Sequence, residues 1–86
     1  GAHPFVATLP PQRQGGFRAG AYDLIDPFNA ALKQVVIDEN ATLVDVNAAF
    51  HGDVSLLGPD GLHPTAAGYE RIAQTYFEAL KGRYER

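Results

Sequence analysis

Two short apolar runs alternate with two segments of helical periodicity, and this order constrains the fold more than any other feature of the chain. The runs are Pro4–Leu9, which Pro10 and Pro11 stop, and Ala41–Phe50. Short apolar runs bounded by turn residues are typical of buried strands. We predict strands over residues 5–9 and 42–47 and helices over residues 27–39 and 65–81. A strand, a helix and a second strand imply a parallel pair joined by a right-handed crossover, so the expected class is α/β with the order β-α-β-α.

The first predicted helix begins and ends at recognisable signals. Asp26 is a suitable N-cap, and Pro27 fits the first helical position, where its missing N–H is not needed. Asn40 is typical of the left-handed residue that follows a helix. The apolar face predicted from the spacing consists of Phe28, Leu32, Val35 and Val36.

The second predicted helix has the clearest periodicity in the chain. Its apolar face consists of Tyr69, Ile72, Ala73, Tyr76, Phe77, Leu80 and Tyr84. Residues at this spacing share one side of a helix, so we interpret the tyrosines as part of a packing face and not as a binding stripe. Gly82 is expected to end the helix.

Composition excludes several classes of function. The net charge is −3 and there is no basic run, which argues against nucleic acid as a partner. No apolar run approaches the roughly 20 residues of a membrane helix, and no signal peptide is visible in residues 1–12. Without cysteine there is no disulfide or thiolate metal site, and the compartment stays undecided. The 86 residues suffice for one small domain with a thin core.

The segment "DGLHPTAAGY" places Asp60 and His63 three residues apart, just before the second helix. An imidazole exchanges protons near neutral pH, and a carboxylate on one ring nitrogen holds the other ready as a base. Gly61 allows the chain to bend, so the carboxylate of Asp60 can reach Nδ1 of His63. The alternative is an ordinary Asp-Gly turn with a histidine that caps the helix.

This segment, followed by an amphipathic helix, resembles the last block of the SGNH (or GDSL) hydrolases. The upstream segments "PFVATLPPQ", "IDPFNAALKQVV" and "ATLVDVNAAF" resemble the fourth strand, the next helix and the fifth strand of that family, so the similarity spans about residues 4–81. The resemblance implies part of a flavodoxin-like parallel sheet in a three-layer α/β/α fold. It also implies that Asp60 and His63 belong to a Ser-His-Asp triad, in which Asp60 is the orienting acid and His63 the general base. Enzymes of this family hydrolyse lipids, short acyl esters or acetylated sugars, and the resemblance implies no metal or other cofactor.

The chain departs from the family pattern where the nucleophile should be. It contains neither a Gly-Asp-Ser block nor the blocks that supply the oxyanion hole. Its one serine, Ser55, lacks a strand-then-helix setting, and we interpret it as an ordinary loop hydroxyl. The resemblance is therefore to the C-terminal portion of such an enzyme, and we expect no esterase turnover from this chain alone.

The absence of the N-terminal portion of the family's domain has a structural consequence. Strand 5–9 would be open on one side, and an open apolar edge recruits another chain. We expect self-association, with a two-fold dimer as the simplest case, or a second polypeptide that completes the domain. A non-catalytic assembly module derived from this fold is the alternative function.

Several other side chains are candidate site residues. His51 and Asp53 could join Asp60 and His63 in a metal site, although no paired ligand spacing supports this. We interpret Asp45 as a hydrogen-bonded structural acid. The long loop of residues 10–22 carries two arginines, Arg13 and Arg18, which could meet an anionic substrate group; a solvated loop is the interpretation we favour.

Overall fold

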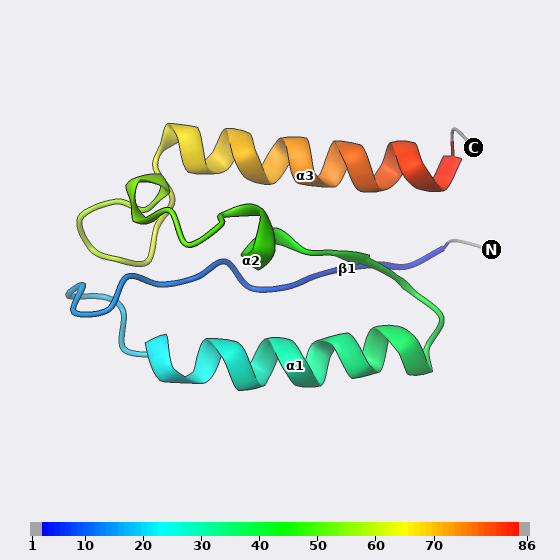
Figure 1. The fold of residues 1–86 in the computed structure, drawn as a ribbon, viewed down its shortest axis with the longest axis horizontal. Coiled ribbons are helices and arrows are strands. Elements are labelled where there is room, and N and C mark those ends of the chain that lie inside the picture. Colours follow the sequence, from blue (N-terminus) through cyan, green and yellow to red (C-terminus); the bar gives the residue numbers. More distant parts are fainter. Residues whose placement is uncertain (1–2, 85–86) are drawn as a thin grey trace.

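A computed structural model describes residues 3–84, which form a strand layer between two long helices (Figure 1). The elements are β1 (Phe5–Ala7), α1 (Tyr22–Asp38), β2 (Thr42–Val44), α2 (Val46–Ala49), the 3-10 helix η1 (Val54–Leu56) and α3 (Ala66–Tyr84). Helices α1 and α3 lie on opposite sides of the strands. The predicted α/β class and the order of the strands and long helices are confirmed; α2 and η1 were not predicted.

The two strands pair in parallel, with Phe5 opposite Thr42 and Ala7 opposite Val44. Both are shorter than predicted. After Val44 the chain turns into α2, because the carboxylate of Asp45 accepts a hydrogen bond from the Ala48 N–H at 3.2 Å and so caps this helix. Asp favours such a cap over a strand position, which ends β2 early.

Helix α1 begins at Tyr22, five residues earlier than predicted, so Asp26 is not its N-cap and Pro27 lies inside it. Pro27 leaves the carbonyl of Asp23 without its helical donor, but both residues are exposed and water can replace the bond. The longer helix buries Ile25, which is 6% exposed. Burial of such a side chain contributes about 1.5–3 kcal/mol, against about 1 kcal/mol for one hydrogen bond. Asn40 is left-handed as predicted, with φ of 53°.

Helix α3 turns only part of the predicted face to the core. Its inward residues include Gly68, Ile72, Thr75 and Ala79, of which Ile72 belongs to the predicted face. The tyrosines of that face are exposed, although the ring centroid of Tyr84 lies 6.1 Å from that of Phe5. A Cβ on Gly68 would overlap the carbonyl of Leu56, so glycine is what lets α3 approach η1 this closely. The helix therefore packs through its smaller side chains and continues through Gly82 to Tyr84.

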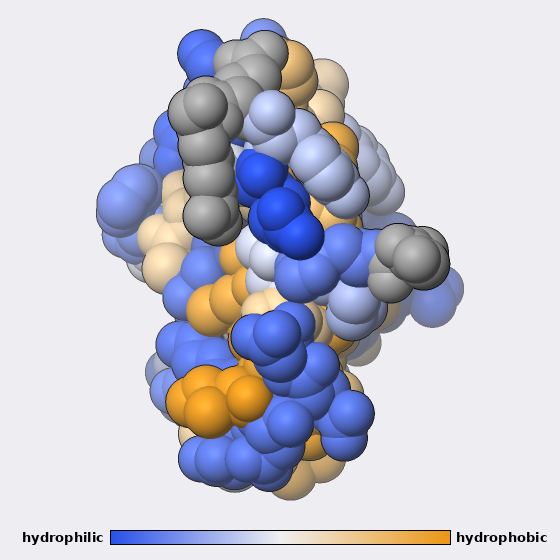
Figure 2. All heavy atoms as spheres, turned by 90° about the vertical axis from the view of Figure 1, so that its right-hand side faces the viewer, coloured by the Kyte–Doolittle hydropathy of each residue, from blue (hydrophilic) through white to orange (hydrophobic). Residues whose placement is uncertain are grey.

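Exposed apolar side chains also remain on α1. Val36 is buried and Leu32 half-buried, but Phe28 and Val35 of the predicted face are 51% and 49% exposed. Figure 2, a view of the end at which α1 and α3 finish, shows an apolar patch over α1 among polar side chains. In residues 3–84 no helix has both the length and the apolar character to span a membrane.

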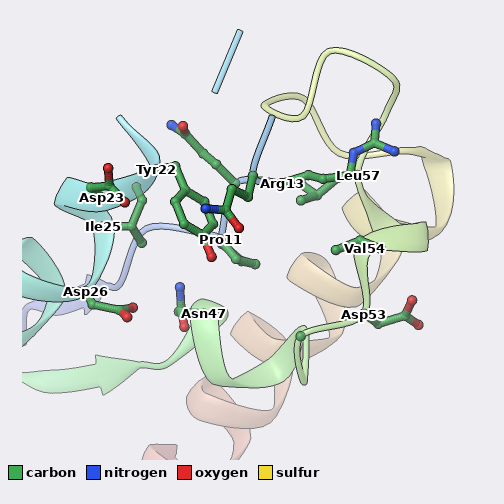
Figure 3. A pocket seen from close by; sticks show the side chains of 13 residues that line it. Pro11, Arg13, Tyr22, Asp23, Ile25, Asp26, Asn47, Asp53, Val54 and Leu57 are labelled. Atoms are coloured by element: carbon green, nitrogen blue, oxygen red, sulfur yellow. The ribbon is translucent and has the colours of Figure 1, made fainter. Parts of the chain in front are cut away.

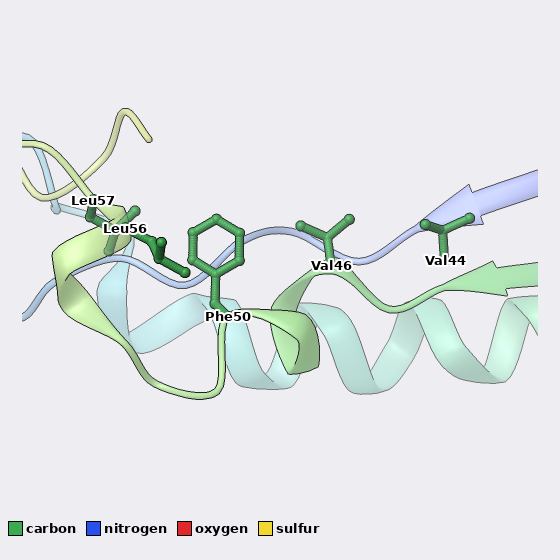
Figure 4. Close-up of a cluster of buried hydrophobic side chains, with 5 residues drawn as sticks. All are labelled: Val44, Val46, Phe50, Leu56 and Leu57. Carbon is green, nitrogen blue, oxygen red and sulfur yellow. The ribbon is translucent and has the colours of Figure 1, made fainter. Parts of the chain in front are cut away.

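The core lies between the strand layer and α3. Five buried residues form it, namely Val44, Val46, Phe50, Leu56 and Leu57 (Figure 4). Ile72 and Ala79 of α3 pack against this cluster. Phe50 is completely buried at its centre, so the α2–η1 segment is fixed against α3 just before the Asp60–His63 turn.

Substitution Phe50→Ala is expected to lower the free energy of unfolding by about 3–5 kcal/mol, because it empties the centre of a small core. The matched control is Phe17→Ala, at a side chain that is 77% exposed, which should cost less than about 0.5 kcal/mol. Urea denaturation followed by circular dichroism measures both. Equal losses in the two variants would contradict this description of the core.

Candidate active site

The Asp60–His63 turn is closed at its base before α3 begins. Leu57 and Pro64 form an isolated antiparallel bridge, and the Gly58 N–H donates to the His63 carbonyl at 2.7 Å. Gly61 has a φ of +78°, a conformation that favours glycine, and its N–H donates to the Gly58 carbonyl at 3.0 Å. The turn is therefore held by its own backbone.

Both carboxylate oxygens of Asp60 accept hydrogen bonds within this turn. Oδ1 accepts from the N–H groups of Leu62 and His63 at 2.9 and 3.0 Å. Oδ2 lies 2.5 Å from Nδ1 of His63. One carboxylate thus both shapes the Asp-Gly turn and contacts the imidazole. His63 does not cap α3, as the alternative interpretation had it, since the Gly68 N–H donates to the Thr65 hydroxyl at 3.2 Å.

These contacts determine the proton positions. The hydrogen bond with His63, followed by the N–H groups of Leu62 and His63, lowers the pKa of Asp60 far below its usual range. An ionised carboxylate only accepts hydrogen bonds, so Nδ1 of His63 carries a proton and, in the neutral ring, Nε2 is the free acceptor. The His63 side chain is 63% exposed and that of Asp60 only 15%. The imidazole is therefore accessible while its partner is sheltered.

The loop after β1 lies against this turn. The Arg13 N–H donates to the Gly61 carbonyl at 2.9 Å, and the Arg18 N–H donates to the Asp60 carbonyl at 2.8 Å. The half-buried guanidinium of Arg13 donates from Nη2 to the Gly58 carbonyl. The guanidinium is thus only partly solvated and is bound to the turn, and it also lines a neighbouring cavity. Sequence patterns gave no signal for this contact, which joins residues far apart in the chain.

Ser55 and the second histidine lie in other surroundings. The Ser55 hydroxyl donates to Oδ1 of Asp53 at 2.6 Å and its N–H donates to the same oxygen at 3.0 Å. Asp53 thus caps η1, and Ser55 lies in this short helix and not in a loop as predicted. His51 is exposed in a left-handed conformation. Across residues 3–84 no three His, Asp or Glu side chains come together as metal ligands, so the metal site considered with Asp60 and His63 is not assembled.

Asp45 is a structural acid, as interpreted. Besides capping α2, it accepts from the Thr8 hydroxyl at 2.9 Å and pairs with Lys33 at 3.5 Å. Burial raises the pKa of Asp45, but the hydrogen bonds from Ala48 and Thr8 and the charge of Lys33 outweigh it, and the pKa is lowered.

A cavity of about 480 Å³ lies beside the site but does not include the Asp60–His63 pair. Tyr22 and Asp26 of α1 line one side, and Asp53 and Val54 line the other (Figure 3). The cavity was not predicted; the long loop of residues 10–22 was the one feature that indicated function in this region.

The Asp60 contacts predict a pH-dependent stability. A carboxylate whose pKa is depressed by folding stabilises the folded state above its unfolded pKa of about 3.9, and that contribution disappears as the pH falls through the folded pKa. The variant Asp60→Asn should therefore have a lower free energy of unfolding than wild type at pH 7. The difference between the two proteins should decrease below about pH 4. Urea denaturation at constant ionic strength from pH 3 to pH 7 measures it; a gap that does not change with pH would contradict the assignment.

Comparison with known proteins agrees with the resemblance to the SGNH hydrolases. The sequence is 27% identical over 81 residues to a protein of Ruminococcus flavefaciens named "Multidomain esterase". That alignment covers 91% of this chain but only 10% of the esterase. No solved structure matches. The sequence also matches the GDSL-like Lipase/Acylhydrolase family over residues 2–71, most of its length, and the chain therefore belongs to this family.

Proposed function

We propose that this chain supplies the acid–base half of a serine ester hydrolase. Asp60 orients His63, and His63 takes the proton of a serine hydroxyl that other polypeptide material provides. The observation that carries the proposal is the 2.5 Å contact between Oδ2 of Asp60 and Nδ1 of an exposed His63. Membership of a lipase/acylhydrolase family supports the type of reaction.

The proposed chemistry follows from the proton positions. Nε2 of His63 accepts the serine proton as the serine oxygen attacks the ester carbonyl, and Asp60 stabilises the resulting imidazolium. The imidazolium then protonates the leaving alcohol, and the same ring activates the water that releases the acid. Substrates of this class are small esters or acetylated carbohydrates, and no cofactor takes part.

The chain alone lacks two parts of this mechanism. Its only serine, Ser55, donates its hydroxyl to Asp53. The family's oxyanion blocks are absent from the sequence, and each such donor is worth a factor of about 10² to 10³ in rate. We therefore propose that these 86 residues have no esterase turnover without a complementing half.

Open surfaces suggest where such a half would bind. Within residues 3–84 strand β1 pairs only with β2, and parallel sheets of two strands are rarely complete. The large exposed apolar residues of the long helices are Tyr22, Leu24, Phe28, Val35 and Ile37 on α1 and Tyr69, Tyr76, Phe77, Leu80 and Tyr84 on α3. We propose that further strands beside β1 and helices over these faces complete a three-layer, flavodoxin-like domain.

Self-association is the second candidate, and the exposed aromatic stripe of α3 favours it. Its members Tyr69, Tyr76, Phe77 and Tyr84 are all exposed, and exposed apolar patches often mark sites of protein association. Two copies that pair along β1 and cover each other's helices would form a non-catalytic assembly module.

The activity proposal is tested by complementation. The chain is mixed with, or fused to, an N-terminal half that carries the serine and oxyanion blocks, and hydrolysis of p-nitrophenyl acetate is measured. We expect no hydrolysis from the chain alone and turnover from the complemented protein. His63→Ala should reduce this turnover by a factor of at least about 10³, because the base is lost.

The control His51→Ala changes an exposed histidine outside the pair and should keep full activity. Complemented activity that survives His63→Ala would refute the role of His63.

The surface proposal is tested by sedimentation of the isolated chain at micromolar concentration, where we expect association. Phe77→Glu places a charge in the α3 stripe and should shift the protein toward monomer. Phe17→Glu, at an equally aromatic exposed position in the loop, should not. A folded wild-type monomer would contradict the need for a partner.

A further inference from the structure

We propose that Arg13 is a positioning residue for the Asp60–His63 pair. It acts through the carbonyl of Gly58, at the base of the turn that carries both side chains. The catalytic meaning of this inference rests on the function proposed above, but the geometry on which it is built does not.

The segment from Arg13 to Ala19, here called the brace, occupies three carbonyls of the turn. The Arg13 side chain binds the carbonyl of Gly58, its N–H binds that of Gly61 at 2.9 Å, and the Arg18 N–H binds that of Asp60 at 2.8 Å. The brace comes from the loop after β1, whereas the turn follows η1. The position of the turn relative to β1 is therefore set by these contacts.

The two backbones touch directly at a pair of glycines. A Cβ on Gly16 would lie 2.6 Å from both the Asp60 carbonyl oxygen and the Gly61 Cα. A Cβ on Gly61 would lie 2.8 Å from the Gly16 Cα. No side chain larger than hydrogen fits at either position, so a displacement of the brace is transmitted directly to the peptide of Asp60.

The Gly58 contact is the one that relates Arg13 to His63. The Gly58 carbonyl accepts from both the guanidinium and the Gly61 N–H, while the Gly58 N–H donates to the His63 carbonyl at 2.7 Å. Gly58 thus joins Arg13 to the backbone of His63. A hydrogen bond from a charged donor is about twice as strong as a neutral one, so this anchor is stronger than the backbone bonds beside it.

The surroundings of Arg13 offer no ion pair that would explain a half-buried cation. Among residues 3–84 no carboxylate lies within ion-pair distance of it, and its Nε is buried without a hydrogen-bond partner. Burial of a charge without a counter-charge is unfavourable. The contact with Gly58 is thus the one hydrogen bond found for the half-buried guanidinium among residues 3–84, and we assign its role to this contact.

The test compares three variants of the chain. Arg13→Met keeps the length of the stem and removes the donors, Arg13→Lys keeps a charged donor, and Arg18→Met removes the same charge from an exposed side chain of the same loop. The readouts are the titration of the Asp60 carboxyl carbon and the Nδ1 proton resonance of His63, both followed by NMR. Circular dichroism checks that each variant keeps its helices.

We expect Arg13→Met to raise the pKa of Asp60 by at least about one unit, toward the ordinary value of about 3.9, and to weaken the Nδ1 proton signal. Arg13→Lys should stay near wild type, and Arg18→Met should titrate like wild type. The proposal would be overturned if the pKa of Asp60 in Arg13→Met equalled that of wild type. It would also be overturned if Arg18→Met shifted this pKa by the same amount as Arg13→Met. Loss of helix in Arg13→Met would do the same, because Arg13 would then support the whole fold. Since no substrate is used, the result does not depend on esterase activity in the complemented protein.

Discussion

The carboxylate of Asp60 is the group on which the local structure depends. One oxygen accepts two backbone N–H groups and shapes the turn, while the other contacts the imidazole of His63. The conformation of the turn and the orientation of the ring therefore have a single cause. Since these bonds favour the ionised carboxylate, the same interaction that holds the turn keeps a proton on Nδ1 and leaves Nε2 available.

The rest of the fold positions this turn from two sides. On one side, Phe50 and the leucines of the core fix η1 against α3, which Gly68 allows to come close. On the other, the brace after β1 meets the turn at Gly16. Because α3 turns its small residues inward, its large aromatic residues remain on the surface, where they fit the proposed role as an interface for the rest of a hydrolase domain.

Local features of the fold and site were predictable, and contacts between distant segments were not. Turn chemistry and spacing suffice to bring Asp60 to His63, since only three residues separate them. Of the inward residues of α3 only Ile72 was predicted, because the close approach at Gly68 turns the small side chains inward and leaves most of the large apolar ones outside. The early start of α1 was missed because the burial of Ile25 outweighs the proline signal. Arg13 meets Gly58 across 45 residues, and no local pattern records that contact.

The tautomer of His63 tests the central claim most directly. A long-range ¹H–¹⁵N correlation spectrum, recorded at a pH where the ring is neutral, distinguishes the protonated ring nitrogen from the free one. The hydrogen bond to Asp60 predicts a protonated Nδ1 and an unprotonated Nε2. A neutral ring with its proton on Nε2 would show that Asp60 does not orient this histidine as a base.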